Sequence, residues 1–147
     1  MKEKKIFILT GPSGSGKSTA LDTFEDAGFY CVDNMPVALL PIFLDRYADD
    51  NSDLPGFVFV MDLREREFLS TYPTIFEQLA STSYPFEIIF LEADEKTLLQ
   101  RYSQTRRHHP LCRSGESLLN SVRAEKGLFE SLKNEASLVI NTSAYSV

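Results

Sequence analysis

The sequence predicts a single α/β domain built on a mainly parallel sheet, and two observations carry this prediction. Short apolar runs rich in β-branched and aromatic residues alternate with longer amphipathic segments, which is typical of parallel strands covered by helices on both faces. The first of these runs leads directly into a glycine-rich loop, GPSGSGKS, which opens a helical segment. Strands and helices are therefore expected to alternate along the whole chain.

Each element has its own signal in the sequence. Five apolar runs are expected to form the strands: Lys5–Thr10, Phe29–Val32, Phe57–Asp62, Glu87–Leu91 and Leu138–Asn141. The first helix is expected to begin at Lys17 and to stop before Gly28, because glycine is favoured where helices end. Pro36 or Pro41 opens the second, since proline is tolerated in a first helical turn. Three further helices are expected over Arg66–Leu79, Glu95–Thr105 and Glu116–Asn134.

Length and composition indicate one soluble domain. The 147 residues are 43% hydrophobic and 24% charged, which is enough for one sizeable core, and the polar stretch 49–56 is interpreted as a loop within it. The net charge of −6 argues against a surface that coats nucleic acid, so any site for a polyanion must be local.

The location of the protein is predicted to be cytoplasmic, without a membrane partner. No run approaches the roughly 18 apolar residues of a membrane-spanning helix, and the N-terminal apolar run is too short for a signal peptide. Cys31 and Cys112 lack the spacing of a metal site and are interpreted as reduced thiols.

The glycine-rich loop has the pattern G-x-x-x-x-G-K-[ST]. It consists of Gly11, Pro12, Ser13, Gly14, Ser15, Gly16, Lys17 and Ser18. Glycines let the backbone approach a polyphosphate and point N–H groups at it, and the following helix adds a favourable dipole. Lys17, expected to be exposed on the loop, would reach the β- and γ-phosphates, and the Ser18 hydroxyl would ligate Mg²⁺. The alternative is a merely flexible Gly/Ser loop, which the flanking strand and helix argue against.

Two aspartates follow predicted strands and are candidate catalytic residues. Asp62 would hold Mg²⁺ or orient a nucleophile, and its alternative role is a helix N-cap or turn residue. Arg64 either faces the same site or is solvated. Asp33 lies at the carboxyl edge, where open α/β sheets bind ligands, and its alternative is an Asx turn with Asn34.

The most basic stretch, residues 101–110, reads RYSQTRRHHP. In an acidic protein such clustering suggests a cover over phosphates, with Arg106 and Arg107 as further catalytic candidates beside Lys17. A solvated helix end is the alternative. His108 and His109 lack the i, i+4 spacing of a metal pair and are assigned no role.

Four segments in order, GPSGSGKS, DAGFYCVDNMP, RYSQTRRHHPL and LVINTS, resemble one family. The chain is similar over essentially its full length to the N-terminal nucleotide-binding domain of the bacterial RapZ/YvcJ family, which includes RNase adapter proteins. The second and third segments are specific to this family. The resemblance implies a P-loop NTPase fold of the kinase-like class, with five strands in the order 2-3-1-4-5. It also implies binding of ATP and GTP, with weak nucleotide hydrolysis as in some members of the family.

The resemblance also places a second nucleotide-associated segment, D-x-R-N in the family, on Asp62, Leu63, Arg64 and Glu65. Glu65 departs from that asparagine. The resemblance further implies a link to RNA, because family members in some bacteria guide an RNase to a small regulatory RNA, and RNA contact in that system depends heavily on a C-terminal domain. Family chains are about twice this length, so residues 1–147 are interpreted as the N-terminal half, and contact with RNA or an RNase is expected only of the longer protein. Homo-oligomer formation is left open.

Three functions remain after these observations. The first is a regulatory nucleotide-binding module with slow hydrolysis, and the second is a small-molecule kinase in which Asp33 or Asp62 acts as base on the acceptor hydroxyl. The third is a binding module that never hydrolyses. No guanine-selective N-K-x-D run occurs, so the sequence does not choose between ATP and GTP.

Overall fold

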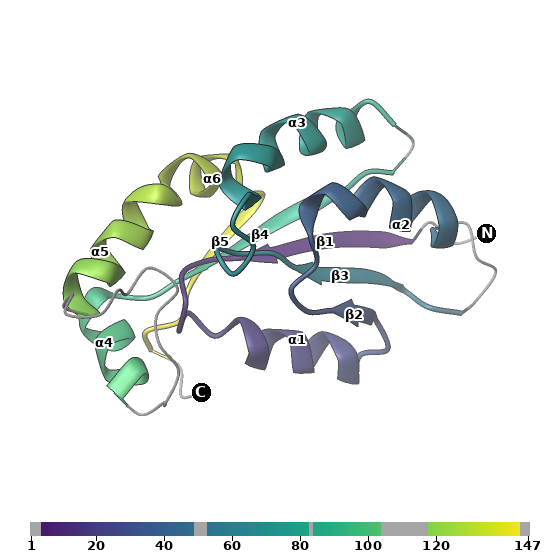
Figure 1. Ribbon diagram of the computed structural model, residues 1–147. Helices are drawn as coiled ribbons and strands as arrows, with labels where there is room; N and C mark the ends of the chain where they lie inside the picture. Colours follow the sequence, from purple (N-terminus) through teal and green to yellow (C-terminus); the bar gives the residue numbers. More distant parts are fainter. Residues whose placement is uncertain (1–3, 49–52, 83, 104–117, 145–147) are drawn as a thin grey trace.

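The fold is a five-stranded sheet in the computed structural model, which describes residues 4–48, 53–82, 84–103 and 118–144 (Figure 1). The strands are β1 (Lys5–Thr10), β2 (Tyr30–Val32), β3 (Gly56–Val60), β4 (Glu87–Glu92) and β5 (Leu138–Asn141). Their order is β2-β3-β1-β4-β5, and each neighbouring pair runs parallel. The predicted class and strand order are confirmed. The strand predicted over Phe57–Asp62 differs at its ends: β3 covers Gly56–Val60, and Asp62 lies beyond its last residue.

The helices follow the predicted alternation. They are α1 (Lys17–Asp26), α2 (Leu40–Tyr47), α3 (Phe68–Ala80), α4 (Glu95–Ser103), α5 (Leu118–Leu128) and α6 (Glu130–Glu135), with a short 3-10 helix η1 (Val37–Leu39) before α2. Gly28 follows the end of α1 with a φ of 94°, a conformation that favours glycine. Both prolines have a place: Pro36 precedes η1, and Pro41 lies in the first turn of α2.

The last predicted helix, Glu116–Asn134, is divided in two at Phe129. The Phe129 side chain is buried, and its ring lies 5.7 Å from that of Phe90 on β4 and 6.4 Å from that of Phe68 on α3. Gly127, a poor helix former, stands just before the break. The Phe129 ring thus packs against the sheet at the point where α5 ends and α6 begins.

Helices cover both faces of the sheet (Figure 1). Because successive side chains of a strand point to opposite faces, Ile8 and Leu9 belong to different clusters. The larger cluster lies under η1, α2, α3 and α6, and the smaller lies over α1. Burial on both faces explains why all five residues of β3 are buried.

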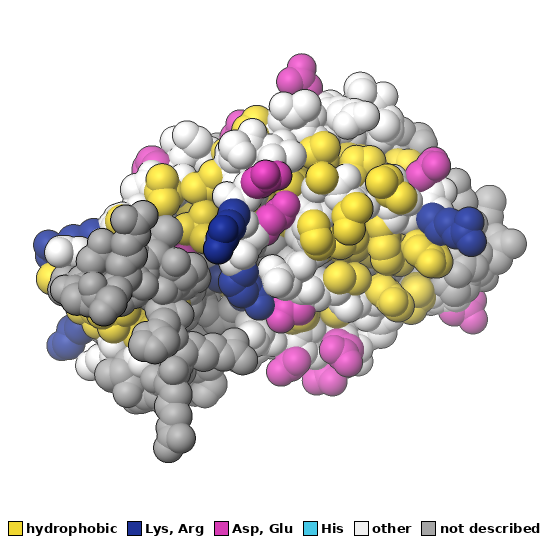
Figure 2. Space-filling model, in the orientation of Figure 1, with side chains coloured by type: hydrophobic (Ala, Val, Ile, Leu, Met, Phe, Trp, Pro, Cys, Tyr) yellow, Lys and Arg dark blue, Asp and Glu magenta, His cyan; other side chains and the backbone are white. Residues whose placement is uncertain are grey.

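One apolar surface remains exposed beside the edge strand β2. Hydrophobic side chains gather over β2 and α2 in Figure 2. The exposed large hydrophobic residues in this part of the chain are Tyr30 of β2, Leu39 of η1, and Ile42 and Tyr47 of α2. Within the described ranges, no helix combines the length and the apolar character needed to cross a bilayer. The chemistry-bearing residues lie instead at the carboxyl ends of the strands, where the loops after β1, β3 and β5 meet.

Candidate functional site

The loop after β1 is a tight turn that requires its glycines. Gly14 and Gly16 have φ values of 83° and 102°, in the left-handed region. A Cβ atom on Gly11 would lie 2.1 Å from the carbonyl oxygen of Leu91 on β4. The N–H of Ser15 donates to the carbonyl of Pro12 at 3.1 Å. The loop is therefore a defined structure that lies against the sheet and opens α1, not a flexible Gly/Ser linker.

Lys17 is folded back into this loop. Its Nζ atom donates to the carbonyl oxygens of Gly11 at 2.7 Å and Pro12 at 3.0 Å, and lies 3.6 Å from Oδ2 of Asp62. The residue is 9% exposed, so the expectation of an exposed lysine is wrong. Burial lowers the pKa of Lys17, and the negative charges of Asp62 and Glu125 oppose that effect. The carbonyl acceptors inside the turn and the nearby carboxylate make the buried position possible.

Asp62 is buried directly beyond β3 and faces two cations. Its Oδ1 atom accepts from the backbone N–H and from Nε of Arg64, each at 2.9 Å, and Oδ2 lies near Lys17. Burial alone would raise the pKa of Asp62, but the Lys17 charge and the Arg64 hydrogen bonds outweigh it and hold the pKa below its ordinary value. The bond to the Arg64 N–H also makes Asp62 a turn residue. It is not the N-cap of α3, which is Glu67.

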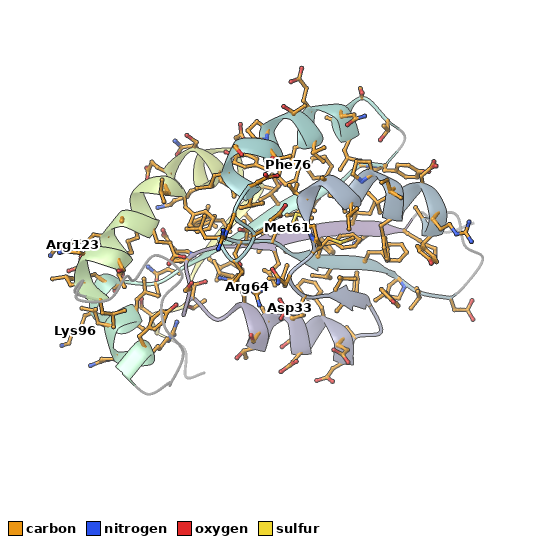
Figure 3. The ribbon with its side chains drawn as sticks, in the orientation of Figure 1. Asp33, Met61, Arg64, Phe76, Lys96 and Arg123 are labelled. Atoms are coloured by element: carbon orange, nitrogen blue, oxygen red, sulfur yellow. The ribbon has the colours of Figure 1, made fainter. Side chains whose placement is uncertain are left out.

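Arg64 joins the two aspartates that sequence analysis singled out. Its Nη2 atom donates to Oδ1 of Asp33 at 2.6 Å, while Nε holds Asp62, so Arg64 faces the site (Figure 3). Burial by itself lowers the pKa of Arg64, but the hydrogen bonds and charges of Asp33 and Asp62 raise it above its ordinary value. Asn34 does form a tight turn, with a φ of 56°. The Asp33 carboxylate, however, is held by the guanidinium.

Leu63 and Glu65 have structural contacts. Leu63 packs against the larger core cluster, and Oε2 of Glu65 accepts from the N–H of Val37 at 2.9 Å, at the start of η1. The residue that departs from the family pattern thus fastens η1 to the segment after β3. The described contacts of Leu63 and Glu65 do not involve the phosphate loop.

Three further residues hold the loop: Arg101, which the sequence analysis included in the basic stretch but not as a contact of the loop, and Thr142 and Glu125, which it missed. Nη1 of Arg101 on α4 donates to the carbonyl of Gly14 at 2.8 Å and to Oγ1 of Thr142 at 2.9 Å. The Thr142 hydroxyl, just after β5, donates to the carbonyl of Ser15 at 2.7 Å. Arg101 and Thr142 belong to two of the family segments, RYSQTRRHHPL and LVINTS, but a sequence pattern does not indicate that two distant segments are in contact.

The third residue is Glu125 on α5, which is 1% exposed. Its Oε1 atom accepts from the N–H of Ser13 at 2.9 Å, and Oε2 accepts from the Ser13 hydroxyl at 3.1 Å. A signal was present in the sequence, because Glu125 follows Val122 by three residues and precedes Phe129 by four. That spacing puts it on the buried face of α5.

The remaining candidates are placed only in part. Ser18 is exposed in the first turn of α1. Arg106 and Arg107 lie outside the described residues, as do His108 and His109. In the part of the chain that the structure describes, no group of three or more His, Cys, Asp or Glu side chains is arranged to hold a metal ion.

The sequence matches the RapZ-like N-terminal domain family over residues 4–147. The chain belongs to this family. It is 54% identical over 147 residues to a nucleotide-binding protein of Desulforapulum autotrophicum, covering 100% of this chain and 50% of that protein. It is 41% identical over 143 residues to a nucleotide-binding protein of Dictyoglomus thermophilum, covering 97% of this chain and 49% of the relative. This RapZ-like domain thus spans about half the length of the curated relatives it matches.

Solved structures of kinases share the fold. Shikimate kinase from Acinetobacter baumannii superposes with a TM-score of 0.63 at 17% identity, over 93% of this chain and 83% of that one. A sugar kinase from Janibacter gives a TM-score of 0.61 at 17% identity, over 94% and 85% of the two chains. These likenesses show that the RapZ-like domain has the P-loop kinase fold, as the family resemblance implied.

Proposed function

We propose that this chain is a regulatory nucleotide-binding domain that takes ATP or GTP at the loop after β1 and hydrolyses it slowly. The observation that carries the proposal is the glycine-dependent turn at the N-terminus of α1, with Lys17 and Asp62 enclosed beneath it. The curated relatives are themselves called nucleotide-binding proteins, which supports it.

The loop offers donors that suit a polyphosphate. Gly16 caps α1 without a side-chain hydrogen bond, so the first N–H groups of the helix remain available to an anion. Among the described residues, the buried hydroxyl of Ser15 has no hydrogen-bond partner, a feature that often marks a functional site. Lys17 would exchange the neutral carbonyls of Gly11 and Pro12 for phosphate oxygens, and such charge-assisted hydrogen bonds are stronger.

Two residues fit a magnesium ion bound with the nucleotide. Mg²⁺, when bound, neutralises charge on the phosphoryl oxygens. The exposed Ser18 hydroxyl is free of the core and suits direct ligation. Asp62 suits contact through a water molecule, because its oxygens already accept from Arg64 and face Lys17.

A small-molecule kinase is the second candidate, favoured by the shared fold of the sugar and shikimate kinases. Both candidate bases are held by Arg64, Asp33 at 2.6 Å and Asp62 at 2.9 Å, which argues against it, since a carboxylate held by a guanidinium is a poorer base for an acceptor hydroxyl. We therefore favour hydrolysis. Control of a small RNA through an RNase is proposed only for the longer family protein.

The test is nucleotide titration of the purified chain by calorimetry, with phosphate release measured in parallel. Wild-type protein is expected to bind ATP or GTP with Mg²⁺, and Lys17→Ala is expected to weaken binding at least about tenfold, from the loss of hydrogen bonds between charged groups. Lys96→Ala, an exposed lysine of α4, is the matched control and is expected to bind as wild type. Absence of binding to wild-type protein would refute the proposal. Rapid phosphorylation of a sugar or shikimate would favour the kinase instead.

We further propose Arg106 and Arg107 as a cover over the bound phosphates. Removing a residue that contacts the phosphates mainly after the cover closes is expected to lower turnover more than ground-state affinity. Arg106→Ala and Arg107→Ala are expected to slow phosphate release at saturating nucleotide, whereas Arg46→Ala on α2 is expected to leave it unchanged. Unaltered turnover in both variants would contradict the cover.

A further inference from the structure

A buried carboxylate is bonded to the loop that we propose as the phosphate site. Glu125 reaches across from α5 and accepts both hydrogen-bond donors of Ser13, the backbone N–H at 2.9 Å and the hydroxyl at 3.1 Å. At 1% exposure it lies on the inner side of the helix and not in solvent. A carboxylate at this place is unexpected, because a loop of this kind normally directs its N–H groups toward an anionic ligand.

The position of Lys17 shows which part of a nucleotide would approach Ser13. The lysine of such a loop reaches the β- and γ-phosphates, and here its ammonium is bonded to Gly11 and Pro12, directly before Ser13. The N–H groups at the start of α1 lie at the other end of the loop. The terminal phosphoryl group of a triphosphate would therefore lie on the Ser13 side, and a diphosphate would end short of it.

Glu125 is close enough to act on this end of the loop electrostatically. Its negative charge raises the pKa of Lys17, against the larger lowering caused by burial. A γ-phosphoryl group that uses the Ser13 donors must first displace the carboxylate from them. A β-phosphate bound nearer to the start of α1 would not need to displace the carboxylate.

We propose that Glu125 is a specificity-determining residue that occupies the Ser13 donors of the phosphate loop and so weakens the binding of triphosphates relative to diphosphates. This inference rests on the proposed nucleotide site. As a consequence, the ratio of diphosphate affinity to triphosphate affinity is higher than it would be for the loop without the Glu125 carboxylate.

Glu125→Gln tests the inference, because glutamine keeps the size and one acceptor oxygen while it removes the charge. Dissociation constants are measured by calorimetry for the magnesium complexes of ADP and of a non-hydrolysable ATP analogue. The variant is expected to bind the triphosphate about tenfold more tightly, a gain of about 1.4 kcal/mol, and to change ADP binding by less than about twofold. Glu130→Gln, an exposed glutamate of α6, makes the same change of charge away from the loop and is expected to alter neither.

The outcomes separate this inference from the proposed function. Failure of wild-type protein to bind either nucleotide refutes both, whereas binding with an unchanged triphosphate-to-diphosphate ratio in Glu125→Gln refutes this inference alone. Weaker triphosphate binding in the variant would also overturn it. Slower hydrolysis at an unchanged triphosphate-to-diphosphate ratio would overturn it too, and would indicate a role of Glu125 in the chemical step. If Glu125→Gln does not fold, Glu125→Asp shortens the reach to Ser13 and is expected to move the ratio in the same direction by a smaller factor.

Discussion

Replacing Asp62 by asparagine is expected to lower the free energy of unfolding by about 3 kcal/mol, whereas Asp33→Asn is expected to lower it by less than about 1 kcal/mol. Both carboxylates bind the same guanidinium, but only Asp62 is buried and has a second cation beside it. The Asp62 side chain is 4% exposed and faces the buried ammonium of Lys17 as well as Arg64. Its neutralisation leaves a buried cation without its counter-charge, which typically costs 3–5 kcal/mol.

The lower end of that range applies because asparagine retains an oxygen for the Arg64 N–H. Asp33 is 49% exposed and Arg64 is 36% exposed, so solvent screens their pairing. The two free energies are obtained from urea unfolding at pH 7, followed by circular dichroism. Added salt is expected to reduce the small effect of Asp33→Asn but not the large effect of Asp62→Asn. Equal costs for the two variants, or a cost below about 1 kcal/mol for Asp62→Asn, would refute the view that Asp62 neutralises the buried pair.

Two further predictions concern pH and the support of the loop. Because Lys17 and Arg64 hold the pKa of Asp62 below its ordinary value of about 3.9, its contribution to stability is complete above about pH 5 and is lost as the pH falls through the lower native pKa. The urea midpoint of wild-type protein is expected to fall more steeply below pH 4 than that of Asp62→Asn, and parallel curves would contradict this. Arg101→Ala removes three hydrogen bonds to the loop and to the residue after β5, and is expected to cost about 2 kcal/mol in the same unfolding assay. Arg123→Ala, which breaks the exposed ion pair between α5 and Glu95 of α4, is its control and is expected to change stability little.

The parts of the structure that follow local rules were predictable. The apolar runs rich in β-branched and aromatic residues located all five strands, and the motif after β1 together with the end of β3 located Lys17 and Asp62 at one edge of the sheet. The position of the Lys17 side chain was not predictable, because its acceptors are backbone carbonyls created by the turn itself. The break at Phe129 was not predictable from local pattern, because the rings that pack against Phe129 come from two other elements.

Glu125 illustrates a different kind of difficulty. A single acidic residue in an amphipathic helix normally faces water, and its spacing from Val122 and Phe129 shows burial only when the inner face of α5 is known. Its partner, Ser13, is 112 residues away in the sequence. No local pattern indicates a pairing over that separation.

The bond between Thr142 and Ser15 links the loop to the far end of the chain, 127 residues later in sequence. Arg101 of α4 stabilises the same contact, because it donates hydrogen bonds to Gly14 and to both oxygens of Thr142. A shift of the loop that lengthens these bonds must therefore pull on the end of β5 as well. In a longer relative whose chain continues past this strand, the continuation would leave the sheet directly after a residue that is hydrogen-bonded to the loop.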